Sequence, residues 1–325
     1  LYGRQRFDYI CGGVQRFVED FLTRWVRQAI AETGVHKIAL SGGIFMNVKA
    51  NKLLLEMPEV EDMFVFPSCG DETNAVGAAY WVYADERRKS GEPIDIAPLS
   101  DLYWGKTWED DDIEQAISAF AFAEKVRVET PADIERRVAE LLAHGEVVAR
   151  VKGRMEFGAR ALGNRSILAN PSDPQVIKTI NEMIKKRDFW MPFAPSVTAE
   201  RVRDYISKPK DVPAPYMILA FDSVPAKESV FPAGIHPYDR TARPQEVTEQ
   251  HNPSYHRLIR YYGEMTGEEI ILNTSFNVHG LPIAYTPQQA LMTLDNSGLQ
   301  YLAIGSFLLS KQAGSKSVRP QPMRG

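Results

Sequence analysis

The sequence predicts an α/β protein in two parts, a partial lobe followed by an α/β domain with a twisted mixed sheet. Segments with apolar residues at helical spacing alternate with short apolar runs that glycine or proline bounds. This alternation is typical of parallel or mixed sheets that helices cover. The 325 residues are enough for about two domains of common size.

The first part, residues 1–95, begins with a long amphipathic helix. Its apolar residues recur at helical spacing from Val14 to Ile30, and Gly34 follows as a stop signal. The elements predicted for this part are a helix over 14–30, a strand over 37–40, a helix up to 55, a strand over 62–66 and a helix from 74.

Residues 91–108 are rich in Gly, Pro and polar side chains, and we interpret 96–110 as a linker or a strap across the surface. A second domain follows at 111–312, and a tail at 313–325. One predicted helix has Thr130 as its N-cap and Gly145 after its end. The elements predicted here are helices over 131–143, 174–184 and from 287, and strands over 146–151, 217–221, 270–272 and 301–304.

Composition and charge narrow the class of protein. Hydrophobic residues make up 44% and charged residues 25%, as in ordinary globular proteins. The only cysteines, Cys11 and Cys69, form no metal or disulfide pattern, which predicts a reducing compartment, the cytoplasm. No membrane span or secretory signal is visible, and with a net charge of −4 a nucleic-acid partner is not expected. The chain begins with Leu1, so we expect that its natural N-terminus is missing.

A basic segment stands out in this acidic chain. From Lys152 to Arg187 there are eight Lys or Arg residues and three acids. Within it, Arg154, Arg160 and Arg165 alternate with glycines at 153, 158 and 163. A single arginine would more often form a surface salt bridge, but three in a glycine-punctuated loop favour the binding of a small polyanion.

Two shorter patterns add polar groups to this picture. Lys185 and Arg187 have K-x-R spacing, which places both cations on one side of an extended segment. Ser275 and Asn277 have S-x-N spacing after a buried strand, and Asn273 precedes them. Hydroxyl and amide groups can orient a phosphate or a carbamoyl group, although S-x-N is also common in turns.

In the first part, Ser41-Gly42-Gly43 joins a strand to a helix. Glycines in such a turn let backbone N–H groups approach a phosphate at the helix N-terminus, but a plain tight turn is commoner. The longer strings LSGGIFMNVKANKLL and PSCGDETNAVGAA resemble the second lobe of the actin/sugar-kinase-like fold of O-carbamoyltransferases and tRNA threonylcarbamoyl-transferases. The resemblance implies that Gly42, Gly43 and Asn47 contact a nucleotide. It also implies that Asp71 is a metal ligand, with Fe²⁺ or another divalent ion completed by a first lobe that this chain lacks.

The strings VKGRMEFGARALGNRSILANP, IKKRDFWMPFAPSV and LNTSFNVHGLPI resemble the YrdC-like C-terminal domain of O-carbamoyltransferases that modify nodulation factors and antibiotics. The resemblance covers about residues 20–310. It implies that carbamoyl phosphate and ATP with Mg²⁺ give carbamoyl-adenylate and pyrophosphate, and that the carbamoyl group then passes to a hydroxyl-bearing acceptor. The implied roles are catalytic for Lys185, Arg187 and Arg160, and substrate-binding for Arg154, Arg165, Arg243, Asn273, Ser275 and Asn277.

Three positions depart from the family's pattern: Ala159 replaces a proline, Met191 an arginine and Leu281 a glutamate. Together with the missing first lobe, they favour one alternative, a degenerate nucleotide-binding module without turnover. A threonylcarbamoyl-adenylate synthase-like enzyme of tRNA modification is the other alternative. A homodimer is also compatible with the sequence. We interpret the tryptophans at 104, 108 and 190 as packing residues rather than a platform for a base.

Overall fold

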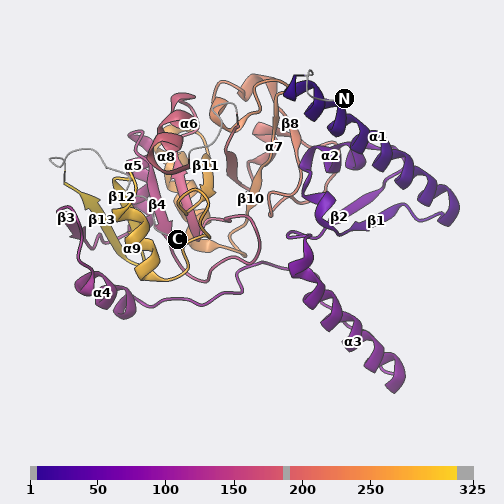
Figure 1. Ribbon diagram of the computed structural model, residues 1–325, viewed down its shortest axis with the longest axis horizontal. Coiled ribbons are helices and arrows are strands. Elements are labelled where there is room, and N and C mark those ends of the chain that lie inside the picture. Colours follow the sequence, from indigo (N-terminus) through magenta and orange to yellow (C-terminus); the bar gives the residue numbers. More distant parts are fainter. Residues whose placement is uncertain (1–5, 186–190, 313–325) are drawn as a thin grey trace. The chain divides into compact units, whose positions relative to one another are not determined.

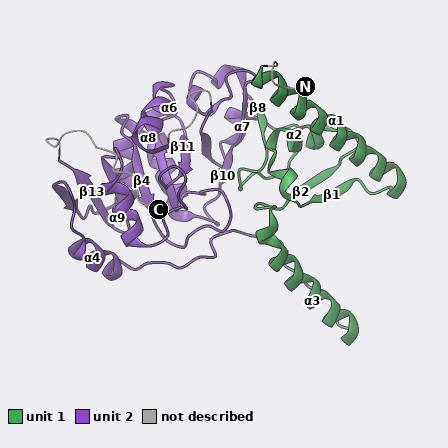
Figure 2. Ribbon diagram, in the orientation of Figure 1, with its two compact units in different colours: residues 1–98, 208–221 green, residues 99–207, 222–325 purple. Residues whose placement is uncertain are grey.

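The structure is a computed structural model, and it describes residues 6–185 and 191–312. It divides into two compact units (Figure 2), Leu1–Pro98 with Lys208–Phe221 as unit 1 and Leu99–Ser207 with Asp222–Gly325 as unit 2. Residues 208–221 therefore belong to unit 1 although they interrupt the sequence of unit 2. In the described ranges, no helix combines the length and the apolarity needed to cross a bilayer.

Unit 1 contains a pair of parallel strands and three α-helices (Figure 1). Its long first helix buries Leu22, Val26 and Ile30, which have the four-residue spacing of one helical face, and Gly34, whose φ is 67°, caps its end. The elements are α1 (Phe7–Thr33), β1 (Lys37–Leu40), η1 (Gly43–Met46), α2 (Val48–Glu56), β2 (Asp62–Val65), η2 (Asp71–Thr73) and α3 (Asn74–Ser90).

Unit 2 contains an eight-stranded mixed sheet and a three-stranded sheet. Its helices are α4 (Asp110–Ala119), α5 (Ile134–Ala143), α6 (Gln175–Ile180), the π-helix η3 (Asn181–Lys185), α7 (Val202–Tyr205), η4 (Pro225–Lys227), η5 (Pro232–Gly234), α8 (Pro253–Thr266) and α9 (Pro287–Asp295). Its strands are β3 (Val126–Glu129), β4 (Val148–Val151), β5 (Arg165–Ala169), β6 (Ala194–Thr198), β7 (Ile206–Ser207), β8 (Phe221–Ser223), β9 (Thr241–Ala242), β10 (Gln245–Val247), β11 (Ile270–Ser275), β12 (Tyr301–Ile304) and β13 (Phe307–Lys311).

The large sheet has the order β10-β6-β11-β5-β4-β12-β13-β3. Strand β4 is parallel to β12 and β6 to β10, whereas β11 is antiparallel to both of its neighbours, β5 and β6. Helices pack on both faces, so β4 and β5 are buried along their whole length. In Figure 1, α5 lies beside α8, and α4 beside α9. The predicted α/β fold with a mixed sheet is confirmed.

Alternation along each strand divides the interior of unit 2 into two apolar cores. One face, with Ala149, Ile167 and Leu272, packs against α4, α6 and α9. The other, with Val148 and Leu168, packs against α5 and α8. Side chains on neighbouring positions of β4, β5 and β11 therefore enter different environments.

Two local predictions are wrong. The strand predicted over 217–221 does not form, because Met217 has a φ of 56°, which the extended backbone of a strand excludes; only Phe221 belongs to β8. Thr130 is not the N-cap of α5. Asp133 has that position, and its carboxylate accepts hydrogen bonds from the backbone N–H groups of Glu135 and Arg136.

Candidate functional site

Lys185 meets the S-x-N pair although 90 residues separate Lys185 from Ser275. Its Nζ donates hydrogen bonds to Ser275 Oγ at 3.1 Å and Asn277 Oδ1 at 2.6 Å, and the Ser275 hydroxyl also donates to Asn277 Oδ1 at 2.7 Å. Lys185 is only 1% exposed. A buried ammonium surrounded by oxygen acceptors forms a positive centre in a low-dielectric environment, where its interaction with an anion is strengthened.

Two local structures bring these side chains together. Lys185 ends the π-helix η3, and π-helical turns are frequent at functional sites because they change the direction of the side chains that follow. Ser275 is the last residue of β11, and the next residue, Phe276, donates its N–H to the carbonyl of Arg165 at 2.9 Å. The predicted partner in the K-x-R pattern, Arg187, lies outside the described residues.

Arg165 lies at the start of β5 and is fully buried. Its Nη1 donates to the carbonyl oxygens of Lys152, Gly153 and Asn164 at 3.1, 3.2 and 2.8 Å. Burial lowers the pKa of the Arg165 guanidinium. We call the loop 153–165 the basic loop. The contacts of Arg165 hold the two ends of this loop together, and its contact with a phosphate stays a prediction.

Glu156 was missed by the sequence analysis, and the structure shows it at the centre of the basic loop. It is 6% exposed, and its Oε1 accepts N–H groups from Leu162, Asn164 and Arg165 at 2.8, 2.6 and 3.2 Å. One buried carboxylate thus gathers three main-chain donors that would otherwise need other partners. The only signal in the sequence is that it is a lone acid among the loop's arginines.

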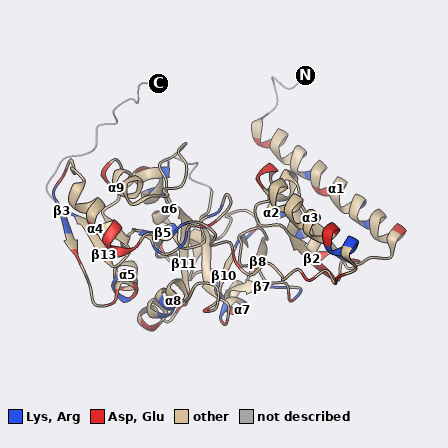
Figure 3. Ribbon diagram, turned by 90° about the horizontal axis from the view of Figure 1, so that it is seen from below, with Lys and Arg blue, Asp and Glu red and all other residues tan. Residues whose placement is uncertain are grey.

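The other predicted arginines occupy more accessible positions. Arg154 is exposed, and its Nε and Nη2 donate to the carbonyl oxygens of Gly105 and Trp104, both at 3.1 Å. Arg160 is partly buried in the basic loop, and Arg243 is partly buried between β9 and β10. In Figure 3, blue ribbon lies beside β5, the strand that the basic loop enters.

Asn273 has a different surrounding from Ser275. It is 1% exposed, and its Nδ2 contacts Ala161 O, Ser196 Oγ and Gln245 Oε1 at 3.1, 3.2 and 3.0 Å. Among the described residues its buried Oδ1 has no hydrogen-bond partner. Asn273 therefore joins the far end of the basic loop to β6 and β10, and its predicted contact with substrate is untested.

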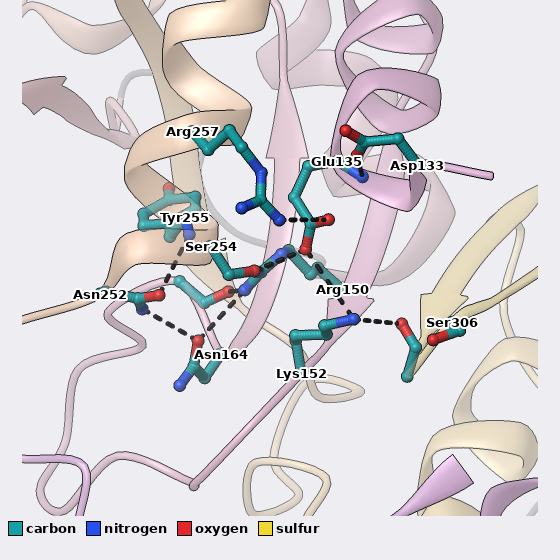
Figure 4. Close-up of polar contacts among 12 residues, drawn as sticks. Asp133, Glu135, Arg150, Lys152, Asn164, Asn252, Ser254, Tyr255, Arg257 and Ser306 are labelled. Atoms are coloured by element: carbon teal, nitrogen blue, oxygen red, sulfur yellow. Dashed lines mark hydrogen bonds and ion pairs between the residues drawn. The ribbon is translucent and has the colours of Figure 1, made fainter. Parts of the chain in front are cut away.

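A buried ionic cluster, also missed by the sequence analysis, holds the end of the basic loop (Figure 4). Arg150 is 3% exposed and donates to Gly163 O at 2.5 Å, Asn164 Oδ1 at 3.1 Å and Ser254 Oγ at 2.6 Å. Ser254 in turn donates to Glu135 Oε1 at 2.5 Å. Burial lowers the pKa of Arg150, although Glu135 opposes the shift. The cluster fixes the basic loop to α5 and α8.

In unit 1, Gly42 has a φ of 116°, and its N–H donates to the carbonyl of Cys69 at 2.9 Å. Gly43 begins the short helix η1, so the turn does not lead directly into α2 as predicted. Asn47 is the N-cap of α2: its Oδ1 accepts the N–H of Ala50 at 3.1 Å, and its amide exchanges hydrogen bonds with Gln15. Their nucleotide contacts stay predictions.

Asp71 is exposed in the first turn of η2. Within residues 6–185 and 191–312, no group of three or more His, Cys, Asp or Glu residues is placed to hold a metal ion. A single exposed carboxylate does not fit a resident transition-metal site.

In unit 2, a buried lysine, a hydroxyl and an amide thus meet at the end of β11, next to the strand that the arginine-rich basic loop enters. Residues 139–311 match the family described as the carbamoyltransferase C-terminus, and residues 3–80 match the carbamoyltransferase N-terminus. The chain belongs to the carbamoyltransferase family, which confirms the resemblance that the motifs indicated.

Known relatives support this membership. The chain is 34% identical to the uncharacterized protein MJ1058 of Methanocaldococcus jannaschii, over 92% of this chain and 48% of that protein. It is 33% identical to the nodulation protein NolO of Bradyrhizobium diazoefficiens, over 94% of this chain and 55% of that protein. The nodulation protein NolNO of Sinorhizobium fredii is also 33% identical, over 96% of this chain and 45% of the relative. The chain spans about half the length of these relatives.

Among solved structures, full-length HypF in a phosphate- and nucleotide-bound form aligns with a TM-score of 0.39 and 20% identity, over 54% of this chain and 25% of HypF.

Proposed function

We propose that unit 2 activates a carbamoyl group with ATP, as the first step of an O-carbamoyltransferase reaction. Water releases inorganic phosphate from carbamoyl phosphate and leaves carbamate. A carbamate oxygen then attacks the α-phosphorus of ATP and expels pyrophosphate, which gives carbamoyl-adenylate. An acceptor hydroxyl finally attacks the carbamoyl carbon, loses its proton and releases AMP. The observation that supports the proposal is the contact of buried Lys185 with Ser275 and Asn277.

The reaction joins two anions, so catalysis depends on neutralising and aligning them. Lys185 is suited to the transferring phosphate because its ammonium is buried and its three donors point at exchangeable oxygen acceptors. A phosphate oxygen would replace one of those acceptors. Ser275 and Asn277 then hold the ammonium in place, and their hydroxyl and amide groups can donate to the same phosphate or to the carbamate.

The basic loop supplies further positive charge. Arg154 and Arg160 are the loop arginines that are not fully buried, and we assign them to the phosphates of the nucleotide. Arg165 and Arg150 use their guanidinium groups on carbonyl oxygens of the loop, so they shape it. In this proposal, Arg154 and Arg160 bind the nucleotide, whereas Arg165 and Arg150 hold the basic loop in shape.

The test is pyrophosphate release from ATP with Mg²⁺, measured with and without carbamoyl phosphate. Lys185→Met should lower the release by at least about 100-fold, the loss expected when one preorganised charged donor is removed. Lys311→Met is the matched control, because Lys311 is another lysine of unit 2, partly buried and bonded to the carbonyl of Ser297 at 2.7 Å. It should keep the activity.

Release that does not depend on carbamoyl phosphate, or that survives Lys185→Met, would contradict the proposal. If threonine with bicarbonate supports release and carbamoyl phosphate does not, the reaction is instead threonylcarbamoyl-adenylate synthesis. Folded protein that binds ATP and releases no pyrophosphate with either would be a nucleotide-binding module without turnover.

A further inference from the structure

The segment 102–105, which we call the strap, is fixed to the basic loop on both sides of Trp104. Phe157 N–H donates to Leu102 O at 2.7 Å, and Gly105 N–H donates to Met155 O at 2.9 Å. The side chain of Tyr103 points inward, and its hydroxyl donates to Leu162 O at 2.8 Å. Burial raises the pKa of Tyr103. The predicted linker is therefore, at this point, a bound part of the loop's structure.

Trp104 is the one strap residue with a large apolar side chain at the surface. Its indole is 38% exposed, whereas neighbouring Leu102 is 3% exposed. The indole stacks on Phe157, with ring centroids 5.0 Å apart and an interplanar angle of 26°. Two stacked rings on a fixed backbone form a rigid aromatic surface, so little conformational entropy is lost when a third ring is added.

A cation lies at the edge of this surface. The guanidinium of Arg154 donates through Nε to Gly105 O and through Nη2 to Trp104 O, both at 3.1 Å, and Nη1 takes part in neither bond. The same side chain that we assign to a nucleotide phosphate is thus anchored to the backbone of Trp104. A flat π-face next to a guanidinium matches the two ends of a nucleotide, its base and its phosphates.

We propose that Trp104, supported by Phe157, is the platform on which the purine base of the nucleotide stacks. This rests on the proposed function, since it assigns a place to the base of the ATP that unit 2 uses. It also revises the interpretation of Trp104 as a packing residue only. Stacking involves the face of a base and not its hydrogen-bonding edges, so the platform itself should favour adenine and guanine about equally.

The test compares a nucleotide with a base-free polyanion on the whole chain, by titration calorimetry with ADP and with tripolyphosphate. Trp104→Ala should weaken ADP binding by roughly 10-fold, the usual order for one stacked base, and leave tripolyphosphate binding unchanged. GDP should weaken by a similar factor. Trp104→Phe keeps an aromatic face and should stay within about threefold of the wild-type affinity.

Trp108→Ala is the matched control. Trp108 lies four residues further along the chain, but its Nε1 donates to Tyr285 O at 3.1 Å and its ring is packed against Tyr285. Its removal should leave the affinity for ADP unchanged. A loss that is equal for ADP and tripolyphosphate in Trp104→Ala would show that the residue only supports the loop, and it would overturn the proposal.

The two proposals fail in different ways. ADP binding that depends on Trp104, in a chain that releases no pyrophosphate, would reject the proposed function and keep the platform. Pyrophosphate release with an ATP KM that Trp104→Ala does not change would reject the platform and keep the function. A wild-type chain that binds no ADP would reject the platform outright.

Discussion

The two units differ in how completely their apolar surfaces are covered. In unit 2, helices pack on both faces of the large sheet, and β4 and β5 are buried throughout. In unit 1, α3 has no buried residue, Trp81 is 66% exposed, and an apolar groove of about 490 Å³ lies along α1 and β1, lined in part by Trp25 and Ile38. The described part of unit 1 thus leaves helix and sheet faces unpartnered.

This difference also distinguishes the predicted sites of the two units. In unit 2, where helices cover both faces of the large sheet, a buried polar group is expected to have a partner or a chemical use. Lys185, Glu156 and Arg150 all pass that requirement. In unit 1, Gly42 and Gly43, which are predicted to bind a nucleotide, are exposed.

The largest effect is expected from a substitution that destabilises unit 2 alone. Gly163 has a φ of 110°, and a Cβ at this position would lie 2.3 Å from Cδ1 of Tyr255. Gly163→Ala combines backbone strain with overpacking against a buried ring, and should cost about 3–6 kcal/mol of unit 2 stability. Hydrogen exchange should rise in β4 and β5 and stay unchanged in α1 and α2.

Gly145→Ala is the control for strain without a clash. Gly145 has a φ of 86°, but a Cβ there would meet nothing within 4 Å. It should cost about 1 kcal/mol. If the two variants are equally destabilised, contact with Tyr255 is not the reason for glycine at 163. If Gly163→Ala also opens α1 and α2, the units do not unfold separately and the comparison fails.

The second prediction concerns the buried carboxylate in the basic loop. Glu156→Ala leaves the N–H groups of Leu162, Asn164 and Arg165 without their acceptor, which should cost about 3 kcal/mol or more. Glu156→Gln keeps an acceptor oxygen and should cost less. Exchange at these three amides measures the effect, and Glu182→Ala, on an exposed surface, is the control. If these amides are as protected from exchange in Glu156→Ala as in the wild type, the basic loop keeps its structure without the Glu156 carboxylate.

The sequence allowed the α/β class and the family to be predicted, because hydrophobic periodicity and long motifs are both local properties. It also predicted that Lys185 and Ser275 belong to one site, through a resemblance and not through any calculation of distance. What it could not predict is which of the arginines are buried and which are exposed. Arg165 and Arg154 are identical in type and in glycine-rich surroundings, yet one is fully buried against carbonyl groups and the other is exposed.

The missed residues have a common cause. Glu156, Arg150 and Glu135 are charged, and charged residues are usually placed at the surface when only a sequence is read. Their burial depends on partners from α5, α8 and the basic loop, separated by up to 119 residues in the case of Ser254 and Glu135. Met217 shows the same limit for the backbone, since its positive φ contradicts an apolar run that otherwise reads as a strand.

The third prediction concerns a substitution that destabilises unit 1 alone, in contrast to the first. The ammonium of Lys210 donates to the carbonyl oxygens of Leu55, Met57 and Val60, where α2 ends, and so ties the segment 208–221 to that helix. Lys210→Met removes a charged donor from all three acceptors and should cost about 2–3 kcal/mol of unit 1 stability. Proteolysis within 48–60 should accelerate while unit 2 stays resistant.

Lys37→Met serves as its control, because the ion pair of Lys37 with Glu61 is exposed on both sides and should contribute little. If Lys210→Met and Lys37→Met reduce the stability of unit 1 equally, Lys210 does not hold the segment 208–221 to α2. Loss of unit 2 resistance in Lys210→Met would show that the segment also supports the second unit.

The smallest expected effect is a pH dependence at the start of α5, in unit 2. Burial acts to raise the pKa of Asp133, but hydrogen bonds from the N–H of Arg136 and the hydroxyl of Tyr261 outweigh it, so the pKa lies below its usual 3.8. Because the folded carboxyl binds its proton less readily than the unfolded one, its contribution to stability is present above about pH 4 and is lost as the pH falls through the folded pKa.

Asp133→Asn tests this, because asparagine is also a good N-cap but does not titrate. Near neutral pH the variant should be less stable by at most about 1 kcal/mol, through the lost charge at the helix N-terminus. The difference should shrink between about pH 5 and pH 3, as the wild-type carboxyl takes up its proton. Asp111→Asn, in the acidic first turn of α4 that Figure 3 shows in red, is the exposed control without a side-chain cap. If the stability difference between the wild type and Asp133→Asn stays constant down to pH 3, the Asp133 carboxylate stabilises α5 through its shape and not through its charge. The cap would then make no contribution to the acid sensitivity of unit 2.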